Sequence, residues 1–424
     1  MNIKINTSWN LFGSIIPLLI GLLAMPALLT NIGVEKLGIL TIIWALVGYF
    51  SVFDLGLGRA LTQRISSLLI LEDYKSISSN IKTGILVVSL AGLLGAVLLY
   101  TLLMSGGADW LNFSEAVYDD ARSSLLIAVF IIPLATITIG LKGVLEGFED
   151  FKSSNILRLI MGILNFGTPV LSVSMFGGKL QYIVMFLAAS RLLVLVLHVQ
   201  AVLKHDSRWL VANFVSRDES TDLIRFGAWM TLSNILSPLM VVADRFVISA
   251  LLGASVVAYY TVPAEFLMRA LIIPGALTAT LFPIFAKLKS GDVKHLYEIY
   301  ISSFRVIGIV MGLIMFFVAA FSYYGLSFWL SADFADNAYL VVIMLSIGVF
   351  FNSLAQIPHG HLQGIGDVRV TALIHVAEAC FYIPTLFLII PVYGLVGVAG
   401  LWSFRAFLDL VALLYFSRKR LMHA

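Results

Sequence analysis

The chain has 424 residues, of which 60% are hydrophobic and 12% are charged, and its mean hydropathy is +0.99. This composition lies far outside that of soluble globular proteins and excludes a water-soluble enzyme or binding module. The formal net charge of +3 is small, and the basic residues follow the membrane topology inferred below, so the charge does not indicate binding to nucleic acid.

Apolar segments long enough to cross a bilayer, which takes about 20 residues, recur from one end of the chain to the other. No connection between them is long enough to hold a soluble domain. The longest, at 61–81, spaces Leu61, Ile65 and Leu68 as a helix would, which is typical of a helix lying on the membrane surface. We therefore expect an all-α integral membrane protein with about twelve transmembrane helices. In chain order, the predicted spans are 9–31, 38–60, 82–105, 122–145, 155–176, 181–203, 223–251, 256–286, 299–321, 338–357, 370–391 and 395–416.

The distribution of basic residues predicts the orientation. If the N-terminus is cytoplasmic, fourteen basic residues fall in the inner segments and only Lys36 and Lys179 fall in the outer loops. Cytoplasmic loops carry the excess of lysine and arginine, so both termini are expected in the cytoplasm. The first apolar segment has the length of a span and lacks a convincing cleavage site, so we expect it to stay in the membrane.

A ten-residue pattern recurs half a chain apart. Residues 143–152 read GVLEGFEDFK and residues 360–369 read GHLQGIGDVR, 217 positions later. Each copy lies between two apolar segments and is expected to form the loop between the fourth and fifth helices of its half. Two related halves are the usual plan of a secondary transporter that handles its substrate between them. The expected domains are an N-terminal six-helix bundle at 1–203, a cytoplasmic linker at 204–222 and a C-terminal six-helix bundle at 223–424.

Motifs for catalysis are missing from the sequence. It contains no P-loop, no H-E-x-x-H and no G-x-S-x-G motif, and its single cysteine, Cys380, excludes an intrachain disulfide. His359 and His361 are two positions apart and would not share a helix face, and as loop residues they are expected to be solvated. We therefore predict no enzymatic activity, no metal and no cofactor. The driving force would come from an ion gradient, from substrate supply and removal, or from a partner.

Several arginines fall inside the predicted spans, where a charge at the bilayer centre costs about 2.5–3.5 kcal/mol. Arg191, Arg269 and Arg405 are predicted to lie too deep to reach either interface, so they should face an interior cavity. A cationic cavity suits an anion, and guanidinium groups bind phosphate or carboxylate in a bidentate manner. The candidate substrate-binding residues are Arg269, Arg191, Arg245, Arg405, Arg305 and Arg59.

Arg269 is the strongest of these candidates because Pro263 and Pro274 flank it, and interrupted helices often line transporter sites. The alternative role is structural, since Glu265 with Arg269, and Arg405 with Asp409, are pairs four residues apart that can neutralise each other. The acids within the spans could instead carry protons or gate the site, and mass action alone could also drive transport. These coupling or gating candidates are Asp54, Asp244, Glu265, Glu378 and Asp409.

Four segments of the chain form a recognisable combination: GVEKLG at 33–38, FSVFDLGLGRALT at 50–62, ADRFVISALLGASVVAYYTVP at 243–263 and TATLFPIFAKL at 278–288. Together they resemble the polysaccharide-biosynthesis branch of the multidrug/oligosaccharidyl-lipid/polysaccharide flippase superfamily. The chain length and the twelve spans suit the Wzx-type O-antigen flippases. The resemblance implies two six-helix bundles around a central cavity, with Gly56 and Gly58 permitting close packing at a gate.

Such proteins move an undecaprenyl-pyrophosphate-linked oligosaccharide from the cytoplasmic to the periplasmic leaflet of the bacterial inner membrane. The partners that this implies are the lipid-linked glycan, the bilayer, and polysaccharide polymerase and chain-length machinery, with no nucleic acid. Three alternatives remain: a multidrug cation exporter of the same superfamily, a lipid II flippase, and a membrane enzyme that modifies polysaccharide. The uncharged first span disfavours the exporter, and the twelve spans disfavour the lipid II flippase, which usually has fourteen.

Overall fold

The computed structural model describes residues 3–50, 57–214, 242–287, 293–365 and 367–422. Within these ranges the chain is helical and contains no β-strand, which confirms the all-α prediction. The chain divides into two compact units, Met1–Leu239 and Met240–Ala424. The predicted bundles at 1–203 and 223–424 and the linker at 204–222 stay a prediction, because residues 215–241 lie outside the described ranges.

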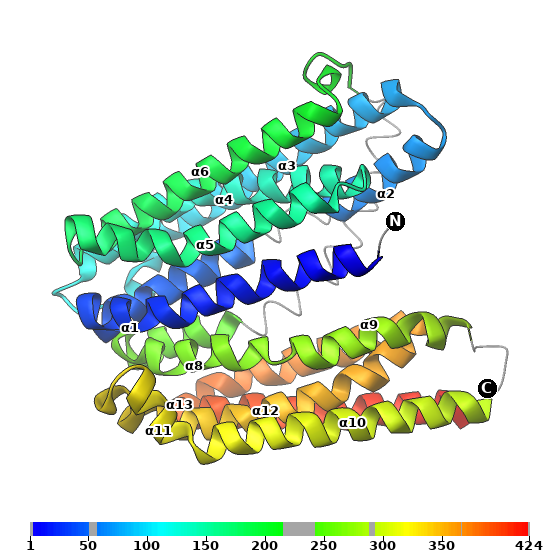
Figure 1. Ribbon diagram of the computed structural model, residues 1–424. Helices are drawn as coiled ribbons and strands as arrows, with labels where there is room; N and C mark the ends of the chain where they lie inside the picture. The colour runs from blue at the N-terminus through cyan, green and yellow to red at the C-terminus, as the bar shows by residue number, and fades with distance from the viewer. Residues whose placement is uncertain (1–2, 51–56, 215–241, 288–292, 366, 423–424) are drawn as a thin grey trace. The chain divides into compact units, whose positions relative to one another are not determined.

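Each unit is a bundle of long helices (Figure 1). The first contains α1 (Ile3–Phe50), α2 (Leu57–Ile70), α3 (Tyr74–Leu102), α4 (Tyr118–Gly147), α5 (Phe151–Phe176) and α6 (Leu180–His205), with short turns at Leu103–Gly107, Asp109–Leu111 and Arg208–Leu210. The second contains a helix at 242–252, a turn at Ala254–Val256, and the helices α8 (Val257–Arg269), α9 (Ile272–Lys287), α10 (Val293–Ala320), α11 (Ser322–Trp329), α12 (Ala332–Gly364) and α13 (Val368–Met422).

Among the described residues, nine helical segments are long and apolar enough to cross a membrane. Two of them, in α1 and α13, are bent at Gly33 and Gly394, where the sequence predicted a short loop between two spans. Each therefore accounts for two predicted spans, so the nine segments correspond to eleven of the twelve. The remaining span, 223–251, lies mostly outside the described residues.

Four glycines at bends between helices share one unusual backbone conformation. In the first unit, Gly33 has φ 76° and ψ 170°, and Gly177 has φ 73° and ψ −171°. In the second, Gly253 has φ 91° and ψ 157°, and Gly394 has φ 57° and ψ −145°. This region of backbone space is essentially restricted to glycine. Gly33 and Gly253 are 220 positions apart, and Gly177 and Gly394 are 217 positions apart, so the internal repeat extends beyond the ten-residue pattern.

The two copies of the ten-residue pattern end their helices with the same backbone hydrogen bonds. The Asp150 N–H donates to the Leu145 carbonyl at 2.9 Å, and the Asp367 N–H donates to the Leu362 carbonyl at 2.8 Å. This spacing is the outer bond of a Schellman cap. The prediction that each whole copy is a loop is wrong, because α4 continues to Gly147 and α12 to Gly364. Only three residues, 148–150 and 365–367, connect the helices.

The glycines at the start of each copy lie where helices cross closely. A Cβ atom on Gly143 would lie 2.1 Å from the Gly58 carbonyl oxygen of α2, and one on Gly360 would lie 2.4 Å from Thr278 Cγ2 of α9. Thr62 Oγ1 also donates to the Gly143 carbonyl at 2.8 Å. Small residues let helix backbones approach within a membrane. Close packing at Gly58 is confirmed, its role at a gate stays a prediction, and Gly56 lies outside the described residues.

The prediction of a membrane-surface helix at 61–81 is wrong. Leu61, Ile65 and Leu68 of α2 are buried in a hydrophobic cluster with side chains of α3 and α4, including Ile81 and Leu141. The apolar face that suggested contact with lipid packs against protein instead, because α2 lies beside α4. The amphipathic pattern indicated a helix correctly, but it did not say which surroundings the apolar face would meet.

Candidate functional site

The helix interruption predicted around Arg269 is present. Helix α8 ends at Arg269 and α9 begins at Ile272 (Figure 1). Pro274 has no N–H, so it cannot donate to the Ala270 carbonyl four residues earlier; the Ile273 N–H occupies that carbonyl instead, at 3.1 Å. Arg269 therefore lies at the break between two helices within the candidate span Ala254–Thr278.

Arg245 is buried and forms an ion pair with a carboxylate on another helix. Its Nη2 lies 2.6 Å from Glu265 Oε1 on α8. Beside it, Asp244 is also buried and accepts hydrogen bonds from Tyr260 Oη at 2.5 Å and from the Arg245 N–H at 2.8 Å. The spacing along the sequence suggested Arg269, on the same helix, as the partner of Glu265; the structure instead pairs Glu265 with Arg245 of the preceding helix.

Arg405 of α13 is buried and paired as well. Its Nη1 lies 3.5 Å from Glu378 Oε2, in the other limb of the same bent helix. Its guanidinium group lies 5.7 Å from the ring centroids of Tyr382 and of Trp402. A guanidinium group against aromatic faces is favourable where water is excluded. The ion pair joins the two limbs of the bent helix, and Asp409, four residues after Arg405, interacts electrostatically with the same guanidinium group.

The two buried acids near Arg405 lie close to the half-buried His375. Ligand atoms of His375, Glu378 and Asp409 lie within 4.8 Å of one another, close enough to hold a metal ion. Within the described part of the chain, Glu378 Oε1 and Asp409 Oδ1 are buried and have no hydrogen-bond partner. A metal would compete with the Arg405 guanidinium for Glu378. The prediction that the chain holds no metal stays a prediction.

We call these side chains of the second unit the polar cluster. It combines two guanidinium groups with four carboxyl groups, so the described part of it is not cationic. Carboxylates on neighbouring segments already pair with Arg245 and Arg405, and the prediction that these arginines bind an anion stays a prediction. The members of the polar cluster are Asp244, Arg245, Tyr260, Glu265, His375, Glu378, Tyr382, Arg405 and Asp409.

The remaining candidates lie elsewhere. Arg269 is half-buried and has no hydrogen-bond or ion-pair partner among the residues that the structure describes, while Arg305 is exposed on α10. In the first unit, Arg191 of α6 donates to Asn165 Oδ1 of α5 at 2.9 Å. The side chain of Arg59 and the whole of Asp54 lie outside the described residues.

Several residues of the polar cluster were not predicted from the sequence. No sequence motif includes Tyr260, Tyr382 or His375, and most aromatic side chains in membrane proteins pack between helices or lie at the membrane interface. His361 was expected to be solvated in a loop, and this is wrong: it is buried on α12, with Nδ1 3.0 Å from Ser417 Oγ. Helical spacing alone could have found His375, because it stands three residues before Glu378.

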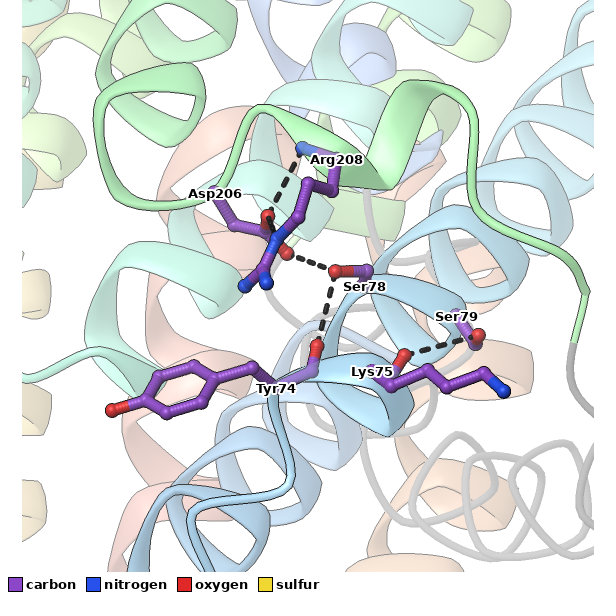
Figure 2. A network of polar contacts seen from close by, with 6 residues as sticks. All are labelled: Tyr74, Lys75, Ser78, Ser79, Asp206 and Arg208. Atoms are coloured by element: carbon purple, nitrogen blue, oxygen red, sulfur yellow. Dashed lines mark hydrogen bonds and ion pairs between the residues drawn. The ribbon is translucent and has the colours of Figure 1, made fainter.

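A second polar network fixes the chain that leaves α6 (Figure 2). Asp206 is buried and accepts hydrogen bonds from Ser78 Oγ of α3 and from the backbone N and Nε of Arg208, the latter two at 3.0 Å. Lys82 Nζ of α3 donates to the Ala212 carbonyl at 2.8 Å. The segment 206–212 is therefore held against α3, within the first unit.

The loop aspartates of the internal repeat each contact the end of a later helix. Asp150 Oδ2 lies 2.8 Å from His205 Nε2 at the end of α6, and Asp367 Oδ2 lies 2.7 Å from Arg420 Nε at the end of α13. Burial alone would raise the pKa of Asp150, but hydrogen bonds from Ser153 and His205 outweigh burial and lower it.

Comparison with known proteins identifies the family. The model of the family described as "Polysaccharide biosynthesis protein" matches residues 3–289. The chain belongs to this family. A curated protein of Shigella flexneri described as "Putative O-antigen transporter" is 32% identical over 414 residues, which cover 97% of each chain. The "Uncharacterized membrane protein EpsK" of Bacillus subtilis is 22% identical over 367 residues, covering 84% of this chain and 71% of that protein.

Solved structures share the fold of this family member. An inward-facing multidrug resistance transporter of the MATE family, in the MOP superfamily, has a TM-score of 0.81 at 13% identity, covering 97% of this chain and 98% of that chain. The lipid II flippase MurJ in an inward closed conformation has a TM-score of 0.77 at 15% identity, covering 99% and 89%. At these identities the likeness shows the fold alone, which is that of a multi-pass membrane transporter.

Proposed function

We propose that this protein is a flippase for a lipid-linked oligosaccharide. It moves an undecaprenyl-pyrophosphate-linked repeat unit of O-antigen, or of another surface polysaccharide, from the cytoplasmic to the periplasmic leaflet by alternating access. The family match and the 32% identity to the Shigella protein over nearly the whole chain support this proposal. The protein would act without covalent catalysis, in the bacterial inner membrane, with both termini in the cytoplasm.

The observation that carries the mechanism is the contrast between Arg269 and the other two interior arginines of the second unit. Arg245 and Arg405 have carboxylate partners within 3.5 Å, so much of their charge is compensated. Arg269 stands at a helix break and has no such partner among the described residues. A guanidinium group in that position can bind a diphosphate in a bidentate manner, while the polyprenyl tail stays in the bilayer.

The Arg269 side chain, rather than the backbone at the break, supplies the donors for an anion. At the start of α9 the Ile273 and Gly275 N–H groups already donate to the Ala270 and Leu271 carbonyls, and Pro274 has no N–H. Arg269 would therefore bind the pyrophosphate through its guanidinium group. The remaining candidates, Arg191, Arg305 and Arg59, would contact acidic sugars or the membrane interface.

The pair of Glu378 and Asp409 is proposed to couple transport to protons. Two carboxylates this close, with one guanidinium group, leave an uncompensated negative charge in an apolar interior, which is costly. One shared proton removes that charge, and the carboxyl oxygens without partners offer a place for it. Asp244 is bound by Tyr260 and Arg245, so it is the less favourable carrier. Asp54, Glu265 and Asp244 remain candidates for gating.

Deletion of the gene in its native host, followed by analysis of lipid-linked glycans, tests the function. The flippase proposal expects undecaprenyl-pyrophosphate-linked repeat units to accumulate and surface polysaccharide to disappear. Unchanged glycans together with new sensitivity to cationic drugs would instead support the multidrug exporter. Accumulation of repeat units that have already crossed the membrane would point to a polysaccharide-modifying enzyme. The glycan that accumulates also identifies the cargo, and co-purification with polymerase and chain-length proteins would test those partners.

A gradient experiment tests the coupling. Export should fall when the proton gradient is collapsed and should lose its pH dependence in Glu378→Gln. The control is Asp244→Asn, which keeps the carboxyl pair and should keep the pH dependence. Export that continues unchanged after collapse of the gradient would contradict proton coupling and leave mass action as the driving force.

A further inference from the structure

The two loop aspartates make equivalent contacts with different chemical partners. Asp150 is 217 positions before Asp367, and each follows a helix end with the same backbone hydrogen bonds. Each carboxylate then reaches the last turn of the sixth helix in its own half. In the first unit that partner is His205, at 2.8 Å, and in the second it is Arg420, at 2.7 Å from both Nε and Nη2.

These two partners respond differently to pH. An imidazole ordinarily changes charge between about pH 5 and pH 8, whereas a guanidinium group stays charged throughout that range. We propose that Asp150 and His205 form a proton-dependent clamp on the first unit, and that Asp367 and Arg420 form its permanently charged counterpart. Asp150 and Asp367 are then positioning residues, each fixing a helix–loop corner through its partner.

The surroundings of His205 favour this role. The Phe148 ring stacks on the imidazole with centroids 5.0 Å apart and an interplanar angle of 11°, which orients His205 towards the loop. Its side chain is 32% exposed, so protons can reach it from solvent. Among the charged groups nearby in sequence, Lys204 directly precedes His205, and Glu149 and Lys152 flank Asp150; all three are exposed. Glu146 on α4 is paired with Lys142 at 3.5 Å.

The clamp is linked to a measurable part of the backbone. Asp150 Oδ1 accepts a hydrogen bond from the Ser153 N–H at 3.0 Å, and the Asp150 carbonyl accepts one from the Ser154 N–H at 3.2 Å. A fixed Asp150 therefore protects the first amides of α5 from exchange with solvent. When His205 loses its charge, the clamp weakens and these amides should exchange faster than their intrinsic rates predict.

Hydrogen exchange measured by mass spectrometry on the full-length protein in lipid nanodiscs tests this inference. After correction for intrinsic rates, protection at 148–154 should be about threefold higher near pH 6 than near pH 8, as expected for a partly exposed pair. Protection at 365–371 in the same molecule should not change. Because the measurement needs no cargo, its outcome is independent of the flippase proposal.

Exchanging the partners makes the test specific. His205→Arg should make the first loop insensitive to pH, and Arg420→His should transfer the pH response to the second loop. Asp150→Asn should remove the response and lower protection at every pH. A pH response at 148–154 that persists in His205→Arg, or that is missing from the wild-type protein, would overturn the inference, and neither outcome depends on whether Arg420→His folds.

Discussion

Replacing Arg269 by alanine should abolish export without unfolding the protein. Arg269 is half-buried and has no described partner, so its loss should change the free energy of unfolding by no more than about 0.5 kcal/mol. Each charge-assisted hydrogen bond to a diphosphate contributes about 1.5–3 kcal/mol, which corresponds to a loss of about ten- to a hundredfold in transport per bond. Arg269→Lys keeps the charge but loses the bidentate geometry, so it should restore export only in part.

The matched control is Arg405→Ala. This substitution leaves Glu378 and Asp409 buried without their guanidinium partner, and breaking a buried pair in this way costs about 3–5 kcal/mol. The assays are surface polysaccharide in a deletion host that expresses each variant, and thermal unfolding of the purified proteins in detergent. The reasoning would be refuted if Arg269→Ala exported normally, or if it lowered the melting temperature as much as Arg405→Ala does.

Three further predictions follow from packing and charge. Gly143→Ala should destabilise the first unit by about 1–3 kcal/mol, because its Cβ would meet a backbone carbonyl. Gly360→Ala should cost less, because its Cβ would meet the Thr278 methyl group rather than the backbone, and adding Thr278→Ser, which removes that methyl group, should relieve the clash in thermal melts. Asp206→Asn should release the segment after α6, so a protease should cleave this segment faster in the variant than in the wild-type protein. Equal cleavage rates in the variant and the wild type would contradict the inference that Asp206 holds the segment against α3. Because the pKa of Asp150 is lowered in the folded protein, its carboxylate stabilises the fold at pH values above the ordinary aspartate pKa of about 3.9. This contribution is lost as the pH falls through the lowered pKa, so in Asp150→Asn the free energy of unfolding should depend less on pH in the acidic range.

The spans were predictable because their signal is local. Hydropathy over about 20 residues identifies a membrane helix without knowledge of its neighbours, and prolines such as Pro274 identify a break because the missing N–H acts within one turn. The bends at Gly33 and Gly394 were predicted as loops for the same reason. The internal repeat could also be recognised from the sequence. Its glycines lie at close helix crossings, where a larger residue would clash, so glycine occurs at the same positions in both copies.

Partners of buried charges were not predictable, because they depend on which helices become neighbours. Spacing along one helix suggested Glu265 with Arg269, whereas Glu265 contacts Arg245 from the preceding helix. The same limit explains α2, whose amphipathic pattern was correct but whose apolar face meets α4 rather than lipid. His361 fails in a related way, since the sequence did not show that α12 continues past it.

In the part of the chain that the structure describes, the two halves repeat their backbone but not their buried charges. Glycine bends, helix caps and loop aspartates recur about 217 positions apart, so the scaffold is duplicated. Among the described residues that lie within helices, however, the buried arginine, aspartate and glutamate side chains all belong to the second unit, while Arg191 of the first is half-buried and bound to a neutral amide. Buried charge is costly and is retained in membranes mainly where it serves a function. The described buried charges of the second unit include Glu378 and Asp409, and these are the side chains on which the proposed proton coupling rests.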